Sequence, residues 1–161
     1  MREEKIKEGV PWAYFDGASN KNNKCGARIV IHLNMHRILK ASVGLGNRSN
    51  KFAELSALKL LLCWLTHLEI HTVQAFGDLM NIIKWFNGES ICQNYILSPL
   101  LDETKHLKFF FNDFSLCHTY REHNDATYQL SNVGLQQDMG NWRIEETDQD
   151  EVRVSDQPPY A

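Results

Sequence analysis

The sequence lacks the features of a membrane-spanning or secreted protein. Its longest apolar stretch, around residues 58–65, is interrupted by Lys59 and is far shorter than the ~20 residues that a helix needs to cross a bilayer. The amino terminus opens on charged residues and has no apolar signal-peptide core. We therefore expect a soluble intracellular protein, either nuclear or cytoplasmic.

Closely spaced cysteine pairs are also missing. The four cysteines stand about thirty residues apart with no CxxC pair, which favours reduced thiols over disulfides or a zinc site. Cys63, His67 and His71 recur every four residues and could bind a metal if one helix carried all three. The strand-like run at 73–76 instead favours a helix that ends before His71.

No strong excess of one charge is present, but the charge is unevenly distributed. The net charge is -3, and residues 136–161 carry seven acids and two bases, which leaves a balance of +2 for residues 1–135. The acidic segment contains few apolar residues and predicts a disordered tail. The mildly basic remainder is compatible with nucleic-acid binding, and its size fits one domain.

The hydrophobic pattern predicts a mixed α/β fold. Segments that alternate or are rich in strand formers predict strands at 12–16, 26–33, 36–45, 71–76 and 113–120. Helical spacing predicts a long helix capped by Asn50, helices at 79–86 and at 93–111 with a break at Pro99, and a short helix at 124–133. An antiparallel meander followed by parallel βαβ crossovers results, with helices covering a central sheet. Aromatic and branched residues at helical spacing are expected in the core rather than stacked on bases, namely Trp64, Ile82, Ile83, Trp85, Phe86 and Phe109–Phe111.

Three carboxylates lie where such a fold would bring them together. Asp16 ends the first strand, Asp78 follows the fourth, and Glu54 falls on the inward stripe of the first long helix. Each has an ordinary alternative: a turn signal for Asp16, a favourable helix first turn for Glu54 and a helix cap for Asp78. If the two strands are neighbours, the three acids converge at one end of the sheet, and crowded carboxylates require a cation. Oxygen ligands favour Mg²⁺ or Mn²⁺.

Four short motifs resemble the ribonuclease H type 1 domain, and most closely its plant retroelement version, which is reverse-transcriptase-like. They are Tyr14-Phe15-Asp16-Gly17-Ala18-Ser19, Asn50-x-x-Ala53-Glu54-Leu55-x-Ala57-Leu58, Gly77-Asp78 and His118-x-x-Arg121-Glu122-x-Asn124. All occur in family order and at compatible spacing over about residues 11–135. Residues 1–10 are then an N-terminal extension, 11–135 a ribonuclease H-like domain and 136–161 the acidic tail.

The resemblance implies a five-stranded mixed sheet flanked by helices and an enzyme that hydrolyses the RNA strand of RNA/DNA hybrids with two metal ions. Asp16 would bridge both Mg²⁺ or Mn²⁺ ions, Glu54 and Asp78 would ligate the second, and His118 would assist proton transfer or product departure. The ions would lie about 3.5–4 Å apart and stabilise the attacking and leaving oxygens. Nucleic-acid contacts are expected from Ser19, Arg48, Asn50, Lys51, Arg121 and Asn124, and the chain is expected to be a monomer.

The chain departs from the family pattern at the fourth carboxylate. The position four residues after Asn124 is Tyr128, a neutral phenol and a poor ligand for Mg²⁺, so we expect reduced catalysis. Asp125, one helical turn earlier, could reach the vacant position. Lys51 and Leu79 replace polar residues of the expected substrate groove, which weakens discrimination of the 2′-hydroxyl while Lys51 can still meet phosphate. The alternative is a catalytically degenerate module that binds nucleic acid or a protein.

Overall fold

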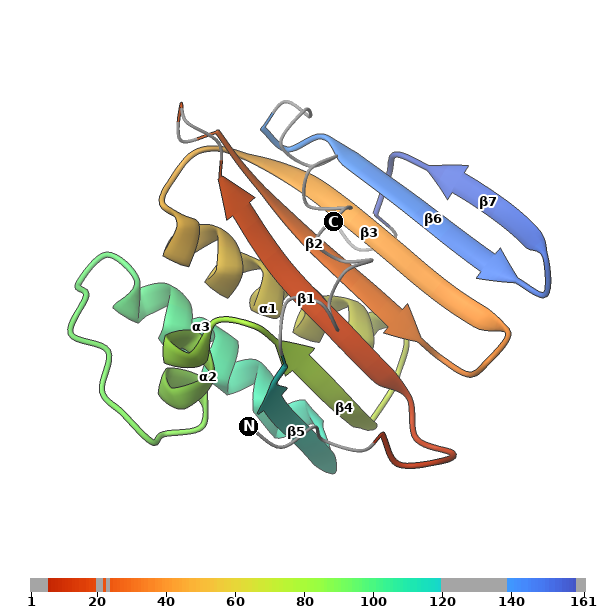
Figure 1. Cartoon of the computed structure of the whole chain (residues 1–161), viewed down its shortest axis with the longest axis horizontal. Coiled ribbons are helices and arrows are strands. Elements are labelled where there is room, and N and C mark those ends of the chain that lie inside the picture. Colours follow the sequence, from red (N-terminus) through yellow and green to blue (C-terminus); the bar gives the residue numbers. More distant parts are fainter. Residues whose placement is uncertain (1–5, 20–21, 23, 120–138, 159–161) are drawn as a thin grey trace.

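The described part of the chain folds around one seven-stranded mixed sheet. The computed structural model describes residues 6–19, 22, 24–119 and 139–158, and the strand order in the sheet is β5-β4-β1-β2-β3-β6-β7 (Figure 1). β1, β2 and β3 form an antiparallel meander, whereas β4 and β5 run parallel to β1. The strands are β1 (Trp12–Ser19), β2 (Lys24–His32), β3 (Arg37–Asn47), β4 (Thr72–Gly77), β5 (Asp113–His118), β6 (Trp142–Asp148) and β7 (Glu151–Ser155). The predicted mixed α/β class is confirmed.

Among the described residues, three helices and one 3-10 turn connect β3 to β4 and β4 to β5. They are α1 (Asn50–His67), α2 (Met80–Phe86), α3 (Ser98–Leu107) and η1 (Lys108–Phe110). α1 packs against β1 and β2, and α3 packs against α1 (Figure 1). Alternate residues of the strands, such as Phe15 and Ile29, join buried leucines of α1 in one core. Within the described ranges, no helix combines the length and the apolar character needed to cross a bilayer.

The cap of α1 differs from the prediction by one residue. Ser49, not Asn50, is the N-cap, because its backbone is extended and its hydroxyl oxygen accepts a hydrogen bond from the backbone N–H of Phe52 at 3.1 Å. Asn50 is instead the first helical residue, which leaves its side chain available to line a neighbouring cavity.

The segment between α2 and β5 also departs from expectation. The predicted helix at 93–111 begins only at Ser98, because the Asn94 side chain accepts hydrogen bonds from the backbone of Ile96 and Leu97 and forms a turn first. Phe109 is 86% exposed, so its predicted burial was wrong: three consecutive phenylalanines cannot all face one side of a 3-10 turn. Phe110 and Phe111 are half-buried.

Most of the other predicted core residues lie where the pattern placed them. Trp64, Ile82, Ile83 and Phe86 are buried, whereas Trp85 is half-buried. The Cys63 series does not form a metal site, because α1 ends at His67 and the ring of His71 stacks on Phe110 with centroids 4.5 Å apart.

The C-terminal segment corrects two predictions, the five-stranded sheet and the disordered tail. Part of residues 136–161 forms β6 and β7, and β6 pairs with β3. Two local features explain this hairpin despite the acidic composition. Ile144 of β6 is only 3% exposed, and Gln149 and Asp150 both have positive φ, as the central residues of a tight type I′ turn do. The edge of β3 then supplies the backbone partners.

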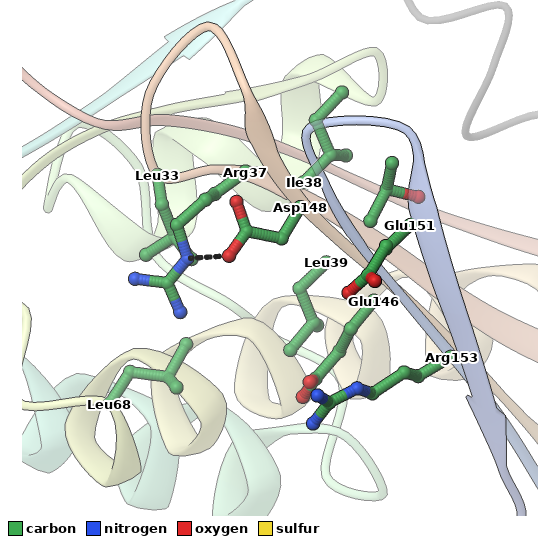
Figure 2. Close-up of a pocket in the computed structure, with 10 residues that line it drawn as sticks. Leu33, Arg37, Ile38, Leu39, Leu68, Glu146, Asp148, Glu151 and Arg153 are labelled. Atoms are coloured by element: carbon green, nitrogen blue, oxygen red, sulfur yellow. Dashed lines mark ion pairs between the residues drawn. The ribbon is translucent and has the colours of Figure 1, made fainter.

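A small cavity of about 150 Å³ lies between β3, the β6–β7 hairpin and the end of α1 (Figure 2). Its rim is charged: Nε of Arg37 lies 3.9 Å from a carboxylate oxygen of Asp148, and both side chains are largely exposed. Glu146 and Arg153 are direct cross-strand partners on the same hairpin, and both line the cavity. The hairpin is therefore joined to the sheet by backbone pairing, one buried isoleucine and solvent-exposed charges.

Candidate metal centre

Asp16 and Gly17 mark the point where β1 meets α1. A Cβ built on Gly17 would lie 2.2 Å from the backbone carbon of Ala53, so only glycine allows the two backbones to approach this closely. The same approach lets the backbone N–H of Gly17 donate a 2.8 Å hydrogen bond to Oε2 of Glu54. The Asp-Gly pair thus fixes the strand against the start of the helix.

Glu54 is a buried carboxylate that lacks a complete set of partners. It is 2% exposed, and among the described residues its Oε1 has no hydrogen-bond partner. Burial, followed by the charges of Asp16 and Asp78, raises the pKa of Glu54 well above 4.5, and the Gly17 hydrogen bond opposes this rise only in part. An ionised Glu54 is therefore unfavourable here unless a cation neutralises it.

Asp78 reaches the same place from the parallel strand β4. A Cβ built on Gly77 would lie 2.4 Å from the Phe15 ring, so glycine at the end of β4 is required for the core ring to pack beneath it. Asp78 itself is half-buried. Because β1 and β4 are parallel neighbours, their carboxyl ends bring Asp16 and Asp78 to one edge of the sheet.

The three carboxylates form one compact group of oxygens. One ligand oxygen from each of Asp16, Glu54 and Asp78 lies within 4.8 Å of the others. They border a cavity of about 220 Å³ that is also lined by Gly17, Asn50, Leu79, His118 and Thr119. A group of three acids with an orphaned buried oxygen fits a hard divalent cation, since such ions take carboxylate oxygens and retain positions for water or phosphate.

His118 enters this cavity from the end of β5. Its Nε2 lies 3.1 Å from the backbone oxygen of Asp78. A carbonyl oxygen can only accept, so Nε2 is the donor, and in the neutral ring Nδ1 is the nitrogen that can take up a proton. The backbone carbonyl of Asp78 therefore helps to orient the ring.

The structure brings together some of the predicted nucleic-acid contacts. Asn50 lines the cavity. The Arg48 guanidinium lies 4.5 Å from the Phe52 ring centroid, and the Lys51 ammonium lies 5.8 Å from that of Trp85. Both positively charged side chains therefore flank the start of α1. Ser19 ends β1.

Four further predicted positions lie outside the described residues, namely Arg121, Asn124, Asp125 and Tyr128.

Sequence reasoning overlooked Thr119, which lines the cavity, and Arg28. Thr119 extends β5 through a 2.8 Å hydrogen bond from its N–H to the Gly77 carbonyl, a contact with no local sequence signal. Arg28 is 1% exposed within β2, directly opposite Asp16 in β1. The signal for Arg28 was available, because it is a lone charge in the strand-forming run 26–33.

The comparisons with known proteins agree with the observed fold. Residues 14–134 match the family model described as reverse transcriptase-like. Ribonuclease H1 from the halophilic archaeon Halobacterium salinarum NRC-1 is 25% identical with a TM-score of 0.74, over 80% of this chain and 98% of that chain. The N-terminal ribonuclease H domain of a Mycobacterium tuberculosis protein, solved as a fusion with maltose-binding protein, is 19% identical with a TM-score of 0.73, over 79% and 94%.

A further solved structure that is similar contains a nucleic acid. LC11 ribonuclease H1, a protein isolated from compost, was crystallised in complex with an RNA/DNA hybrid. In that complex it is 21% identical to this chain with a TM-score of 0.66, over 78% of this chain and 96% of that chain. No curated protein sequence matches. The family match spans most of the chain, and ribonuclease H1 from Halobacterium salinarum shares the fold over 80% of it, so this chain belongs to the reverse transcriptase-like family of ribonuclease H-type domains.

Proposed function

We propose that this chain is a metal-dependent endonuclease that hydrolyses the RNA strand of RNA/DNA hybrids. The observation that carries the proposal is the convergence of Asp16, Glu54 and Asp78, with ligand oxygens within 4.8 Å of one another. Three crowded acids destabilise the fold unless they bind a cation. A catalytically degenerate module would therefore have no reason to retain them. The similarity to a ribonuclease H1 crystallised with a hybrid supports the choice of substrate.

Asp16, Glu54 and Asp78 would hold Mg²⁺ or Mn²⁺. Once bound, the divalent metal activates water and stabilises negative charge during phosphodiester hydrolysis. The Gly17 N–H orients Glu54 through Oε2 and leaves Oε1 for the cation. His118, held by the Asp78 carbonyl, would assist proton transfer or product departure.

The hybrid would lie along the start of α1 and the end of β1. Arg48 and Lys51 supply sequence-independent phosphate contacts, and Asn50 and Ser19 supply hydrogen-bonding groups at the cavity edge. Arg121 and Asn124 are proposed to extend this surface, by their positions in the sequence alone. Affinity should then fall steeply with added salt, as it does where lysine and arginine neutralise phosphates.

Tyr128 supports a second candidate function, a module that keeps the fold and binds nucleic acid without cleaving it. Tyr128 stands where the family supplies a fourth carboxylate, and a phenol is a weak ligand for a hard cation. In that case Asp125 would fail to replace the missing ligand. The two candidate functions differ in whether the wild-type chain cleaves the RNA/DNA hybrid.

A cleavage assay separates the two candidates. The full chain is incubated with an end-labelled RNA/DNA hybrid in Mg²⁺ or Mn²⁺, beside single-stranded RNA, RNA duplex and DNA duplex. If the chain is a nuclease, it should cleave only the hybrid among these substrates, and the cleavage rate of Asp78→Asn should be lower by at least about 100-fold. Cleavage by Tyr128→Asp but not by the wild type would support the degenerate module, and hybrid cleavage that survives Asp78→Asn would contradict the assigned site.

A further inference from the structure

A buried arginine lies beside the carboxylate cluster. Arg28 of β2 stands directly opposite Asp16 of β1 in the antiparallel register, and side chains in this position share one face of the sheet with Cβ atoms about 5 Å apart. The row continues through Ser42 of β3 to Arg143 of β6. Arg28 is 1% exposed, whereas Arg143 at the far end of the row is exposed.

The surroundings of Arg28 leave part of its hydrogen-bonding capacity unsatisfied. Among the residues that the structure describes, its Nε and Nη1 have no hydrogen-bond partner. Burial, followed by the charge of Arg143, lowers the pKa of Arg28 from 12.5 to about 9, and Asp16 and Glu145 oppose this change. The guanidinium therefore remains charged at neutral pH, at a position where an apolar side chain would avoid the cost of burying an ion.

Of the two acids whose charge acts on Arg28, the carboxylate cluster supplies the one with the larger effect. Asp16 is the direct cross-strand neighbour, and it belongs to a group of three acids. A fixed positive charge one strand away lowers the repulsion among these acids when no metal is present. The same charge repels a divalent cation that enters the cluster, and both effects act against metal binding.

We propose that Arg28 is an internal counter-cation of the carboxylate cluster, and that it lowers the affinity of the cluster for divalent metal. The inference rests on the proposed function, because it concerns metal binding at the same three acids. It adds a residue that sets how much Mg²⁺ or Mn²⁺ the chain needs. Charges on side chains of neighbouring strands still interact strongly where solvent is largely excluded, so we expect an effect on the order of tenfold in the dissociation constant.

The test compares Arg28→Met with Arg143→Met in the full chain. Both changes remove one positive charge from the same row, but Arg143 lies on the second strand beyond β2, roughly 10 Å farther from Asp16. Calorimetric titration with Mn²⁺ should give about tenfold tighter binding for Arg28→Met. Arg143→Met should stay within about twofold of the wild type, since an exposed charge is screened.

Two further variants separate charge from structure. Arg28→Lys retains the charge and should keep the dissociation constant within about twofold of the wild-type value. Arg28→Gln is a second neutral variant that still offers a polar group, should Arg28→Met fail to fold. Thermal unfolding with and without Mn²⁺ gives an independent measurement, and the metal-induced rise in melting temperature should be larger in both neutral variants.

The outcomes distinguish this inference from the proposed function. Equal affinities in the wild type and Arg28→Met, or weaker binding by the variant, would overturn the counter-cation and leave the nuclease proposal intact. Binding by Arg28→Met but not by the wild type would support Arg28 as a substitute for the metal and contradict the proposed function. Absence of binding in both would contradict both.

Discussion

Where the carboxylates converge, a Cβ built on Gly17 would lie 2.2 Å from the backbone of Ala53. In the edge strand β7, by contrast, all five residues are exposed. The acidic end is held by backbone in contact with backbone, so the positions of its carboxylates depend on contacts that tolerate no added atom. The β6–β7 hairpin depends on strand pairing and one buried side chain. The two regions should therefore respond differently to mutation, and only the first should affect metal binding.

The largest effect is expected from Gly17→Ala. The new methyl group would collide with the Ala53 and Glu54 backbone, and separating β1 from α1 should cost about 3 kcal/mol or more of the free energy of unfolding and abolish Mn²⁺ binding. Denaturant unfolding and calorimetry measure both. Gly88→Ala is the control, since Gly88 has a φ of +75° with open space around it and should lose only about 1 kcal/mol. Equal losses in the two variants would refute the close-contact explanation.

Substitutions in the β6–β7 hairpin should lower the free energy of unfolding by less and should leave Mn²⁺ binding at the carboxylate cluster unchanged. Ile144 is 3% exposed, and Ile144→Ala should lower the free energy of unfolding by about 2 kcal/mol through the cavity that it leaves. The rise in melting temperature on adding Mn²⁺ should match that of the wild type. Val154→Ala, at a position 54% exposed, should change stability by less than about 0.5 kcal/mol. Loss of the Mn²⁺-induced rise in melting temperature in Ile144→Ala would show that the β6–β7 hairpin and the carboxylate cluster are coupled.

The contrast between the regions also explains what the sequence could predict. Asp16, Glu54 and Asp78 were expected to converge because each lies near an end of an element whose type was readable from local periodicity. Neighbouring parallel strands then bring such ends together. The roles assigned to these acids and to His118 stay predictions, since no ligand tests them.

The features that the sequence did not predict depend on backbone geometry and on contacts between segments that are distant in the chain. The β6–β7 strands were missed because a composition rich in acids describes a segment in isolation, whereas the edge of β3 supplies its pairing. Ser49 displaced Asn50 as the cap because a choice between adjacent capping residues depends on backbone angles. Arg28 was visible in the sequence as a lone charge in its strand, but its importance arises from the register with Asp16, which the sequence alone does not give.

A smaller, pH-dependent effect should sharpen the comparison at the acidic end. Burial and the two neighbouring acids raise the pKa of Glu54 above 4.5, so the metal-free folded protein binds a proton more tightly than the unfolded chain. Its free energy of unfolding should therefore fall as the pH rises from about 4.5 through the raised pKa. Glu54→Gln keeps an acceptor for Gly17 and removes the charge. It should stabilise the metal-free protein at neutral pH by on the order of 1 kcal/mol and abolish this pH dependence.

Denaturant unfolding in a chelator between pH 5 and pH 8 measures that difference. Mn²⁺ should reverse the ranking, because it stabilises the wild type and not Glu54→Gln. Parallel pH profiles for the two proteins would mean that Glu54 is not the group whose charge opposes folding.

The smallest effect is expected at the charged rim of the hairpin. Arg37 and Asp148 form the ion pair drawn as a dashed line in Figure 2. The two side chains approach to 3.9 Å but are 56% and 65% exposed, so water and salt screen the attraction. Arg37→Ala, Asp148→Ala and the double variant form a cycle that isolates the pair, and its coupling energy should be below about 0.5 kcal/mol and vanish in high salt. A coupling above about 1 kcal/mol that persists in salt would mean that the hairpin, like the acidic end, depends on a specific contact. The difference between the two regions would then be one of degree, since both edges of the sheet would be fixed by contacts that a single substitution can break.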